Sequence, residues 1–202
     1  MSPRGVAVPD ARERLFAAAE RVVARGGPGA LTSRAVTEEA GCSKGLLHAH
    51  FAGGLDEFVA ELVLDRFART AALAAKLPMR AGEDTVAANL TEVATALFTS
   101  TGPAVSGLAL TRPGSALRFR DAMAAGAPGF TAVQEAVTTY LRAEQRLGRF
   151  DGRLDAEALA LALVGTVHHL LMTSHPGTPD PAAQIRRLVT ALTGGGPHIT
   201  DQ

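Results

Sequence analysis

Residues 43–51 combine basic, hydroxyl and very small side chains in a pattern suited to binding DNA. Lys44 and His48 are four residues apart, so on a helix they would share one face. Leu47 and Phe51 have the same spacing and would share another face. Such a helix can be held to a core by its apolar pair while its polar pair enters the major groove of a duplex.

Three further residues of this segment support the same chemistry. Gly45 and Ala49 are small enough to let the backbone approach base edges, and Leu46 can contact a thymine methyl group. Hydroxyl side chains and the free N–H groups at helix N-termini add donors for phosphate oxygens. The predicted DNA-binding residues are Thr32, Ser33, Arg34, Ser43, Lys44, Gly45, Leu46, His48, Ala49 and His50.

Two short helices joined by a glycine turn are expected to position these side chains. Thr32 is expected to cap a helix over residues 33–40, and Gly41 to permit a tight left-handed turn after it. Ser43 is expected to cap a second helix over residues 44–51. Two short helices in this arrangement indicate a helix-turn-helix.

Helical periodicity continues through most of the chain, which predicts an all-α fold. Ala and Leu recur at helical spacing, and neither strand-like alternation nor an internal repeat is present. Gly- and Pro-rich breakers divide the chain into about nine or ten helical segments. The first is expected to open at Asp10, with Glu13 completing a variant of the capping box. A long segment over about residues 56–76 would link the N-terminal helices to the rest.

The charge balance limits where DNA could bind. Lys and Arg together number 20, as do Asp and Glu, so the formal net charge is zero. A uniformly basic, non-specific nucleic-acid-binding protein is therefore disfavoured. Any contact with DNA must be local.

Cysteine content and hydropathy favour a cytoplasmic protein. Cys42 is the only cysteine, so no internal disulfide is possible, and the N-terminus lacks the features of a secretory signal. The most apolar stretch, residues 156–172, carries Glu157, His168 and His169 and is marginally short for a bilayer. We expect a buried helix there and no membrane partner.

Residues 31–51 read Leu-Thr-Ser-Arg-Ala-Val-Thr-Glu-Glu-Ala-Gly-Cys-Ser-Lys-Gly-Leu-Leu-His-Ala-His-Phe, and this segment resembles the helix-turn-helix of the TetR (tetracycline-repressor-like) family of transcriptional regulators. In that family the segment typically ends Ala-Gly-Val-Ser-Lys-Gly-Thr-Leu-Tyr-x-His-Phe. The matching residues are Ser43, Lys44, Gly45, Leu47, His50 and Phe51. The resemblance covers about residues 10–70 and implies an all-helical homodimer with an N-terminal DNA-binding domain and a larger ligand-sensing domain.

Three positions depart from the family pattern. Leu46 stands where the family often has Thr, and His48 where a Tyr usually contacts a phosphate. After the phenylalanine that ends the match, the family commonly continues Pro-Ser-Lys, whereas this chain continues Ala52-Gly53-Gly54-Leu55 and lacks that phosphate-binding lysine. We expect either an affinity for DNA below that typical of the family or a replacement contact from Arg34 or Lys44.

Selectivity for one DNA site requires two such helices, because one helix reads only a few base pairs. Two symmetric domains about 34–36 Å apart would read a near-palindromic operator of double-stranded DNA. The resemblance implies that the last two long helices, over about residues 156–174 and 182–193, form a four-helix bundle with the partner's pair. The predicted dimer-interface residues are Leu159, Leu163, Val167, Leu170, Ile185, Leu188, Val189 and Leu192.

The resemblance also implies a small-molecule effector, which would shift the protein between DNA-competent and DNA-incompetent states. Aromatic, Met and polar side chains in the C-terminal domain suggest an apolar pocket for a hydrophobic molecule with one or two polar groups. The predicted ligand-binding residues are Phe98, Arg118, Phe119, Met123, Phe130, Gln134, Tyr140, His168 and Met172.

These observations together predict a ligand-responsive DNA-binding regulator, in the form of a repressor that its effector releases from the operator. Since promoter geometry decides the sign of regulation, an activator stays open. The predicted organisation is a flexible tail over residues 1–9, a three-helix helix-turn-helix domain over 10–55, a helical ligand-binding and dimerisation domain over 56–193, and a flexible tail over 194–202.

Two alternatives remain beside this prediction. No nucleophile with its base, paired carboxylates, P-loop or dinucleotide fingerprint is present, so we expect no enzyme and no cofactor. An all-α enzyme or carrier with a similar N-terminal motif is the first alternative. The second is a haem or metal sensor on the same scaffold, because His168, Met172 and His175 share one helical face. A metal site at Cys42 is disfavoured, since the histidines near it point to different faces.

Overall fold

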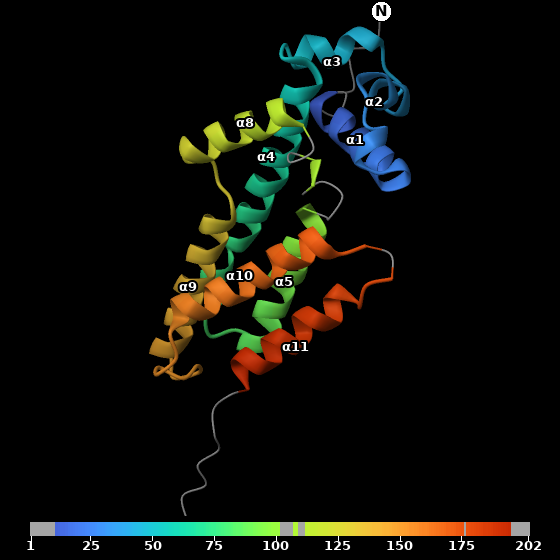
Figure 1. Ribbon diagram of the computed structural model, residues 1–202. Helices are drawn as coiled ribbons and strands as arrows, with labels where there is room; N and C mark the ends of the chain where they lie inside the picture. The colour runs from blue at the N-terminus through green and yellow to red at the C-terminus, as the bar shows by residue number, and fades with distance from the viewer. Residues whose placement is uncertain (1–10, 102–106, 109–111, 176, 195–202) are drawn as a thin grey trace, which may run out of the picture. The chain divides into compact units, whose positions relative to one another are not determined.

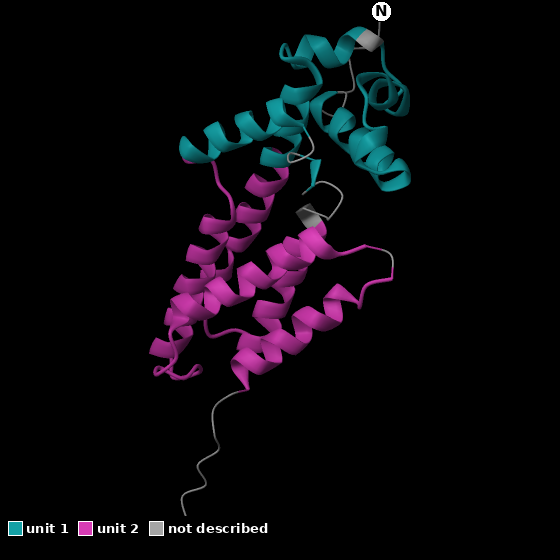
Figure 2. Ribbon diagram, in the orientation of Figure 1, with its two compact units in different colours: residues 1–64, 104–125 teal, residues 65–103, 126–202 magenta. Residues whose placement is uncertain are grey.

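A computed structural model describes residues 11–101, 107–108, 112–175 and 177–194. The regular structure among these residues is helical and includes no strand (Figure 1), which confirms the predicted all-α fold. The chain divides into two compact units, residues 1–64 with 104–125 and residues 65–103 with 126–202 (Figure 2). The predicted cap at Asp10 and the predicted tails, apart from Gly194, lie outside the described residues.

Unit 1 contains the two predicted short helices and one helix from much later in the chain. Its elements are α1 (Ala11–Gly26), η1 (Pro28–Ala30), α2 (Ser33–Glu39), α3 (Lys44–His50), the first part of α4 (Gly54–Ala74) and α8 (Pro113–Ala124). The division of the structure therefore differs from the predicted domain boundary at residue 55, because α4 continues from unit 1 into unit 2 and α8 belongs to unit 1.

Three buried phenylalanines form the centre of unit 1. Phe51 packs edge-on against Phe58 with ring centroids 5.0 Å apart, and Phe16 lies 5.9 Å from Phe51 and 5.5 Å from Phe58. All three are almost fully buried. The Arg12 guanidinium lies over the Phe51 ring, 4.9 Å from its centroid. Arg12 also forms an ion pair with Glu61 of α4. These contacts join α1, the end of α3 and α4 into one core.

Helix α8 is attached to the start of α4 through Asp56. The Arg112 Nε donates to Asp56 Oδ1 over 2.5 Å, and the Ser115 hydroxyl donates to the Asp56 carbonyl over 3.0 Å. A Cβ atom at Gly114 would collide with the Asp56 carboxylate, so α8 and the start of α4 lie in close contact there. This set of contacts explains why α8 groups with the N-terminal helices.

Unit 2 contains the remaining helices around an apolar core. Its elements are the last part of α4, η2 (Leu77–Arg80), α5 (Val86–Thr101), α9 (Phe130–Arg146), α10 (Ala156–Thr173) and α11 (Pro181–Thr193). Helix α10 packs against α9, α5 and α11, and α5 also packs against α11. Asp155 and Asp180 cap α10 and α11 by accepting hydrogen bonds from the first N–H groups of each helix.

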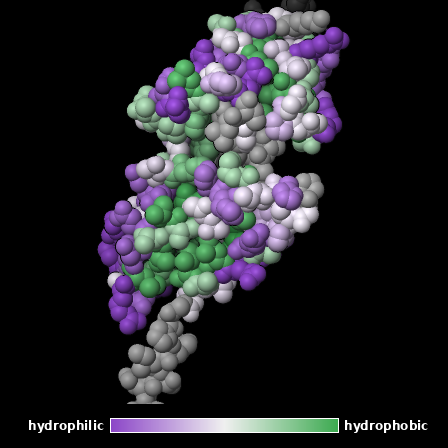
Figure 3. Space-filling model, in the orientation of Figure 1, coloured by the Kyte–Doolittle hydropathy of each residue, from purple (hydrophilic) through white to green (hydrophobic). Residues whose placement is uncertain are grey.

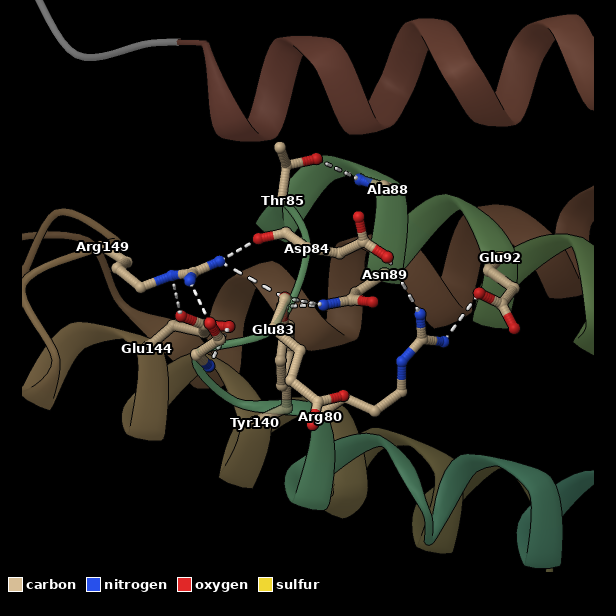
Figure 4. Close-up of polar contacts among 11 residues, drawn as sticks. Arg80, Glu83, Asp84, Thr85, Ala88, Asn89, Glu92, Tyr140, Glu144 and Arg149 are labelled. Carbon is tan, nitrogen blue, oxygen red and sulfur yellow. Dashed lines mark hydrogen bonds and ion pairs between the residues drawn. The ribbon is translucent and has the colours of Figure 1, made fainter.

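A buried polar network ties the segment before α5 to the end of α9 (Figure 4). Asn89 Nδ2 donates to the Tyr140 hydroxyl oxygen over 2.9 Å, and the Gly82 N–H donates to Glu144 Oε1 over 3.1 Å. Arg149 pairs with the fully buried Glu144 carboxylate at 2.9 Å and donates to the Gly82 carbonyl. Burial raises the pKa of Tyr140 to about 12, the Asn89 hydrogen bond opposes that rise, and Glu144 adds to it.

The ionisation of Tyr140 can be measured directly, because the chain has one tyrosine and no tryptophan. Its native pKa of about 12 lies above the ordinary value of 10.0, so the unfolded state ionises first. The stability that this difference contributes is present below pH 10 and is lost between pH 10 and 12. We expect the tyrosinate absorbance of folded protein to appear near pH 12, and that of urea-unfolded protein near pH 10. Coincident titrations would contradict the burial of Tyr140.

Candidate DNA-binding surface

The turn between α2 and α3 has the predicted geometry. Thr32 caps α2, with its Oγ1 accepting from the Ala35 N–H over 3.1 Å, and Gly41 adopts the left-handed conformation at a φ of 63°. The Cys42 N–H then donates to the Thr37 carbonyl over 3.0 Å. These contacts confirm the predicted cap at Thr32 and the turn at Gly41. Each helix ends one residue earlier than predicted.

Ser43 occupies the cap position of α3 without the predicted capping bond. Its backbone is extended there, but its hydroxyl makes no hydrogen bond to the first turn of α3. The Leu46 N–H instead donates to the Ser43 carbonyl over 3.0 Å. The Ser43 side chain is exposed, and its hydroxyl is not used by the helix cap.

Helix α3 has a buried side and an exposed side, as its sequence predicts. Leu47 and Phe51 are completely buried in unit 1. Gly45, His48 and Ala49 are exposed, and no atom lies within 4 Å of a Cβ placed on Gly45. His50 is exposed as well, and Leu46 is half-buried. Lys44 lies in the first turn of α3, but its side chain is outside the described part of the structure.

Arg34 is the predicted DNA-binding residue of α2 with the longest reach. It is exposed and donates through Nε to Glu38 Oε1 over 2.7 Å. An exposed pair one helical turn apart contributes little to stability, so the guanidinium can exchange Glu38 for a phosphate at small cost. Ser33 is half-buried beside it, and the Thr32 hydroxyl is occupied by the cap.

Other arginines near α2 are held by a carboxylate. Glu39 accepts hydrogen bonds from Arg25 and from Arg21, the second over 2.6 Å. The hydrogen bond from Arg25, followed by that from Arg21, lowers the pKa of Glu39 to about 2. Glu39 therefore stays ionised at neutral pH and keeps both arginines on α1, where they join α1 to α2.

The predicted ligand-binding residues fall in both units. Arg118, Phe119 and Met123 lie on α8 in unit 1, and the other six lie in unit 2. The structure brings together Phe130 and His168, whose ring centroids are 5.0 Å apart. It adds Phe67, a residue that the sequence analysis missed, with its ring 4.9 Å from Phe130.

The remaining ligand predictions in unit 2 lie apart from this aromatic group. Tyr140 follows Phe130 by ten residues of α9, about 15 Å along the helix, and belongs to the polar network. Gln134 lines a polar groove on α9 and α10, Phe98 is half-buried against the core, and Met172 is exposed. The predicted pocket is therefore divided among separate places, and its role in binding stays a prediction.

The predicted interface residues lie on the inner side of unit 2. Five are buried in the core of the chain itself, at 4% exposure or less: Leu163, Val167, Leu170, Ile185 and Val189. The other three, Leu159, Leu188 and Leu192, are half-buried against that core. Because α10 is apolar on nearly every side, its periodicity does not show which side faces inward. These five side chains already make their contacts within the chain itself, and the predicted dimer interface stays a prediction.

The outer side of α10 is apolar too. Leu161 is 58% exposed and Met172 is 40% exposed, with Ala158, Ala162 and Gly165 also on the surface. Apolar side chains gather over α10 and the neighbouring α5 and α11 in Figure 3. Among the described residues, α10 is the one helix long and apolar enough to cross a membrane by length and composition, which is weak evidence because core helices pass the same test.

Within the described ranges, no group of three or more His, Cys, Asp or Glu side chains is placed to hold a metal ion. Cys42 is half-buried, and its Sγ lies 3.6 Å from the Thr37 carbonyl oxygen, to which it donates.

Residues 15–60 match the family model described as bacterial regulatory proteins, tetR family. A comparison with curated protein sequences finds no match. Among solved structures, the chain is similar to the transcriptional regulator FadR of Bacillus subtilis in complex with stearoyl-CoA, with 15% identity, a TM-score of 0.64 and coverage of 91% of this chain and 98% of that one.

Two further solved structures are similar over nearly their whole length. The TetR family transcriptional regulator PfmR of Thermus thermophilus is 17% identical with a TM-score of 0.59, covering 90% of this chain and 98% of that one. The multidrug binding protein EbrR, complexed with imidazole, is 25% identical with a TM-score of 0.51, covering 96% of this chain and all of that one.

The two caps of the helix-turn-helix should differ in their effect on stability. Thr32→Ala removes a capping hydrogen bond and is expected to lower the free energy of unfolding by about 1 kcal/mol in urea unfolding followed by circular dichroism. Ser43→Ala removes a hydroxyl that makes no capping bond, so we expect a change below about 0.5 kcal/mol. Equal losses from the two variants would contradict the assigned caps.

Proposed function

On the premise that the chain belongs to the tetR family of bacterial regulatory proteins, which its N-terminal domain and its fold show, we propose that it acts as a homodimeric repressor. In this proposal it binds a near-palindromic operator in the cytoplasm and is released by a small-molecule effector. The proposal includes no catalysed reaction and no bound cofactor.

The exposed side of α3 is the observation that carries the proposal. Its buried side is fixed by Leu47 and Phe51, while Gly45, His48 and Ala49 face solvent. A rigidly held helix with small residues beside a hydrogen-bonding side chain can approach base edges in the major groove. His48 can donate to a base acceptor or to a phosphate oxygen, and the exposed Ser43 hydroxyl adds a donor at the start of the helix.

A homodimer is supported by the outer side of α10. Leu161 and Met172 form an exposed apolar surface whose burial against a partner would be favourable. Gly165 has no side chain, so the backbone of a second copy can approach α10 closely there. A twofold axis beside α10 would place the same side chains of two copies against each other. The interface proposed on α10 is therefore the side opposite Leu163, Val167 and Leu170.

An organic effector is supported by the apolar and aromatic character of unit 2. Phe67, Phe130 and His168 form a contiguous group of rings, which suits an apolar ligand with one hydrogen-bonding group. FadR with stearoyl-CoA and EbrR with imidazole, which share this fold, are both complexed with organic molecules. We propose a ligand of that general class for this chain.

Selection of bound duplexes from a random DNA pool tests the proposal. The wild-type protein is expected to enrich a near-palindrome, and His48→Ala and Lys44→Ala are expected to weaken its binding roughly tenfold or more, since a direct contact contributes about 1–3 kcal/mol. Lys76→Ala is the matched control, because Lys76 is the only other lysine of the chain and follows α4 in unit 2. Absence of any enriched sequence at low salt would sink the proposal.

The dimer can be tested on the outer side of α10. Leu161→Glu places a charge on the proposed interface and is expected to produce monomers in analytical ultracentrifugation, because a buried unpaired charge is costly. Leu147→Glu is the control, since Leu147 is exposed to a similar degree, 56%, at the end of α9. If Leu161→Glu sediments as a dimer, the interface lies elsewhere.

A further inference from the structure

A double glycine, Gly53-Gly54, follows α3 and leads into α4. Gly54 begins α4 with a φ of 69°, a conformation that a lysine would adopt only with strain. Gly53 has no such backbone restriction. Neither residue can supply a cation, so a phosphate contact beside this junction must come from another part of the chain.

The guanidinium of Arg118 lies over Gly53. Its Nη2 atom is 2.6 Å from the position that a Cβ of residue 53 would take, so a side chain there would collide with it. On the other side of the junction, the His48 ring lies 3.8 Å from the Cβ position of Gly54. His48 and Arg118 thus flank the double glycine, and all four residues belong to unit 1.

Arg118 is held near this place by the attachment of α8 to α4. Ser115 is three residues before Arg118 and donates to the Asp56 carbonyl, while Arg112 pairs with the Asp56 carboxylate. Asp56 is in the first turn of α4, two residues after Gly54. The backbone of Arg118 is therefore fixed relative to the start of α4, which follows the end of α3.

The Arg118 guanidinium forms no ion pair with a carboxylate in the described parts of unit 1. The side chain is exposed and makes no hydrogen bond or ion pair with a described residue. The nearby Glu57 carboxylate accepts from the Gly53 N–H instead. Other arginines of unit 1 do pair with carboxylates, namely Arg12, Arg21, Arg25, Arg34 and Arg112.

We propose that Arg118 binds a phosphate of the DNA backbone beside the groove that α3 enters. This inference rests on the function proposed above and adds α8 to the DNA-binding surface. A guanidinium suits the task because its N–H groups can donate two parallel hydrogen bonds to phosphate oxygens. A backbone contact of this kind positions the protein without reading sequence.

The salt dependence of binding tests this role. Full-length Arg118→Gln is compared with wild type on the duplex selected by the wild type and on a scrambled duplex. We expect roughly tenfold weaker binding to both, and a slope of log K against log salt smaller by about 0.9 per protomer, since one fewer counterion is released. Arg118→Lys keeps the charge and is expected to keep most of the slope.

Arg120→Gln is the matched control. Arg120 is exposed on α8 two residues further on, about 200° around the helix, so its replacement removes the same charge from the opposite side. We expect its slope and affinity to equal those of wild type. Circular dichroism and the melting temperature establish whether each variant is folded. If Arg118→Gln is not folded, the salt dependence of Arg118→Lys is compared with that of wild type instead.

The outcomes separate this inference from the function on which it rests. An unchanged slope for Arg118→Gln, in protein whose wild type binds the operator, overturns the phosphate contact and leaves the proposed function intact. Selective loss of operator preference overturns it too, because that result indicates a base contact. If the wild type binds no duplex, the proposed function fails and the Arg118 contact fails with it.

Discussion

The packing of Phe51 against Phe16 and Phe58 is the constraint on which the DNA-binding surface depends. Phe51 directly follows α3, so burying its ring against α1 and α4 fixes the rotation of α3 about its own axis. Only with that rotation fixed do His48 and Gly45 face solvent. Deleting a large core side chain typically costs about 3–5 kcal/mol, far more than any exposed contact of this surface contributes.

Charge is distributed so that a neutral chain can still present a local cation. Most arginines of unit 1 are neutralised by a neighbouring carboxylate, and Glu39 alone holds both Arg21 and Arg25. Such ion pairs attach helices to one another, and because their charges cancel they add little to the electrostatic potential that approaching DNA experiences. In the proposal made above, Arg118, an exposed arginine of α8, supplies such a local cation, which the net charge of zero does not reveal.

The sequence predicts the N-terminal helices well because their signals are local. Thr32, Gly41 and the Leu47–Phe51 pair act within one or two helical turns, and the structure has the cap, the turn and the buried side where they were expected. It does not predict the inward side of α10, because a helix that is apolar all round has no periodic signal. Nor does it predict that α8 joins unit 1, since this depends on contacts of Asp56 with residues more than fifty positions away.

Hydroxyl-radical footprinting of the wild-type protein on its selected duplex would show whether two symmetric copies of α3 enter successive major grooves, because it reports which backbone positions the protein covers. A homodimeric regulator is expected to give two protected runs related by the twofold symmetry of the operator and separated by a whole number of helical turns, about 34–36 Å for a single turn. A single unsymmetrical run, or uniform cleavage under conditions where the protein is dimeric and folded, would contradict it.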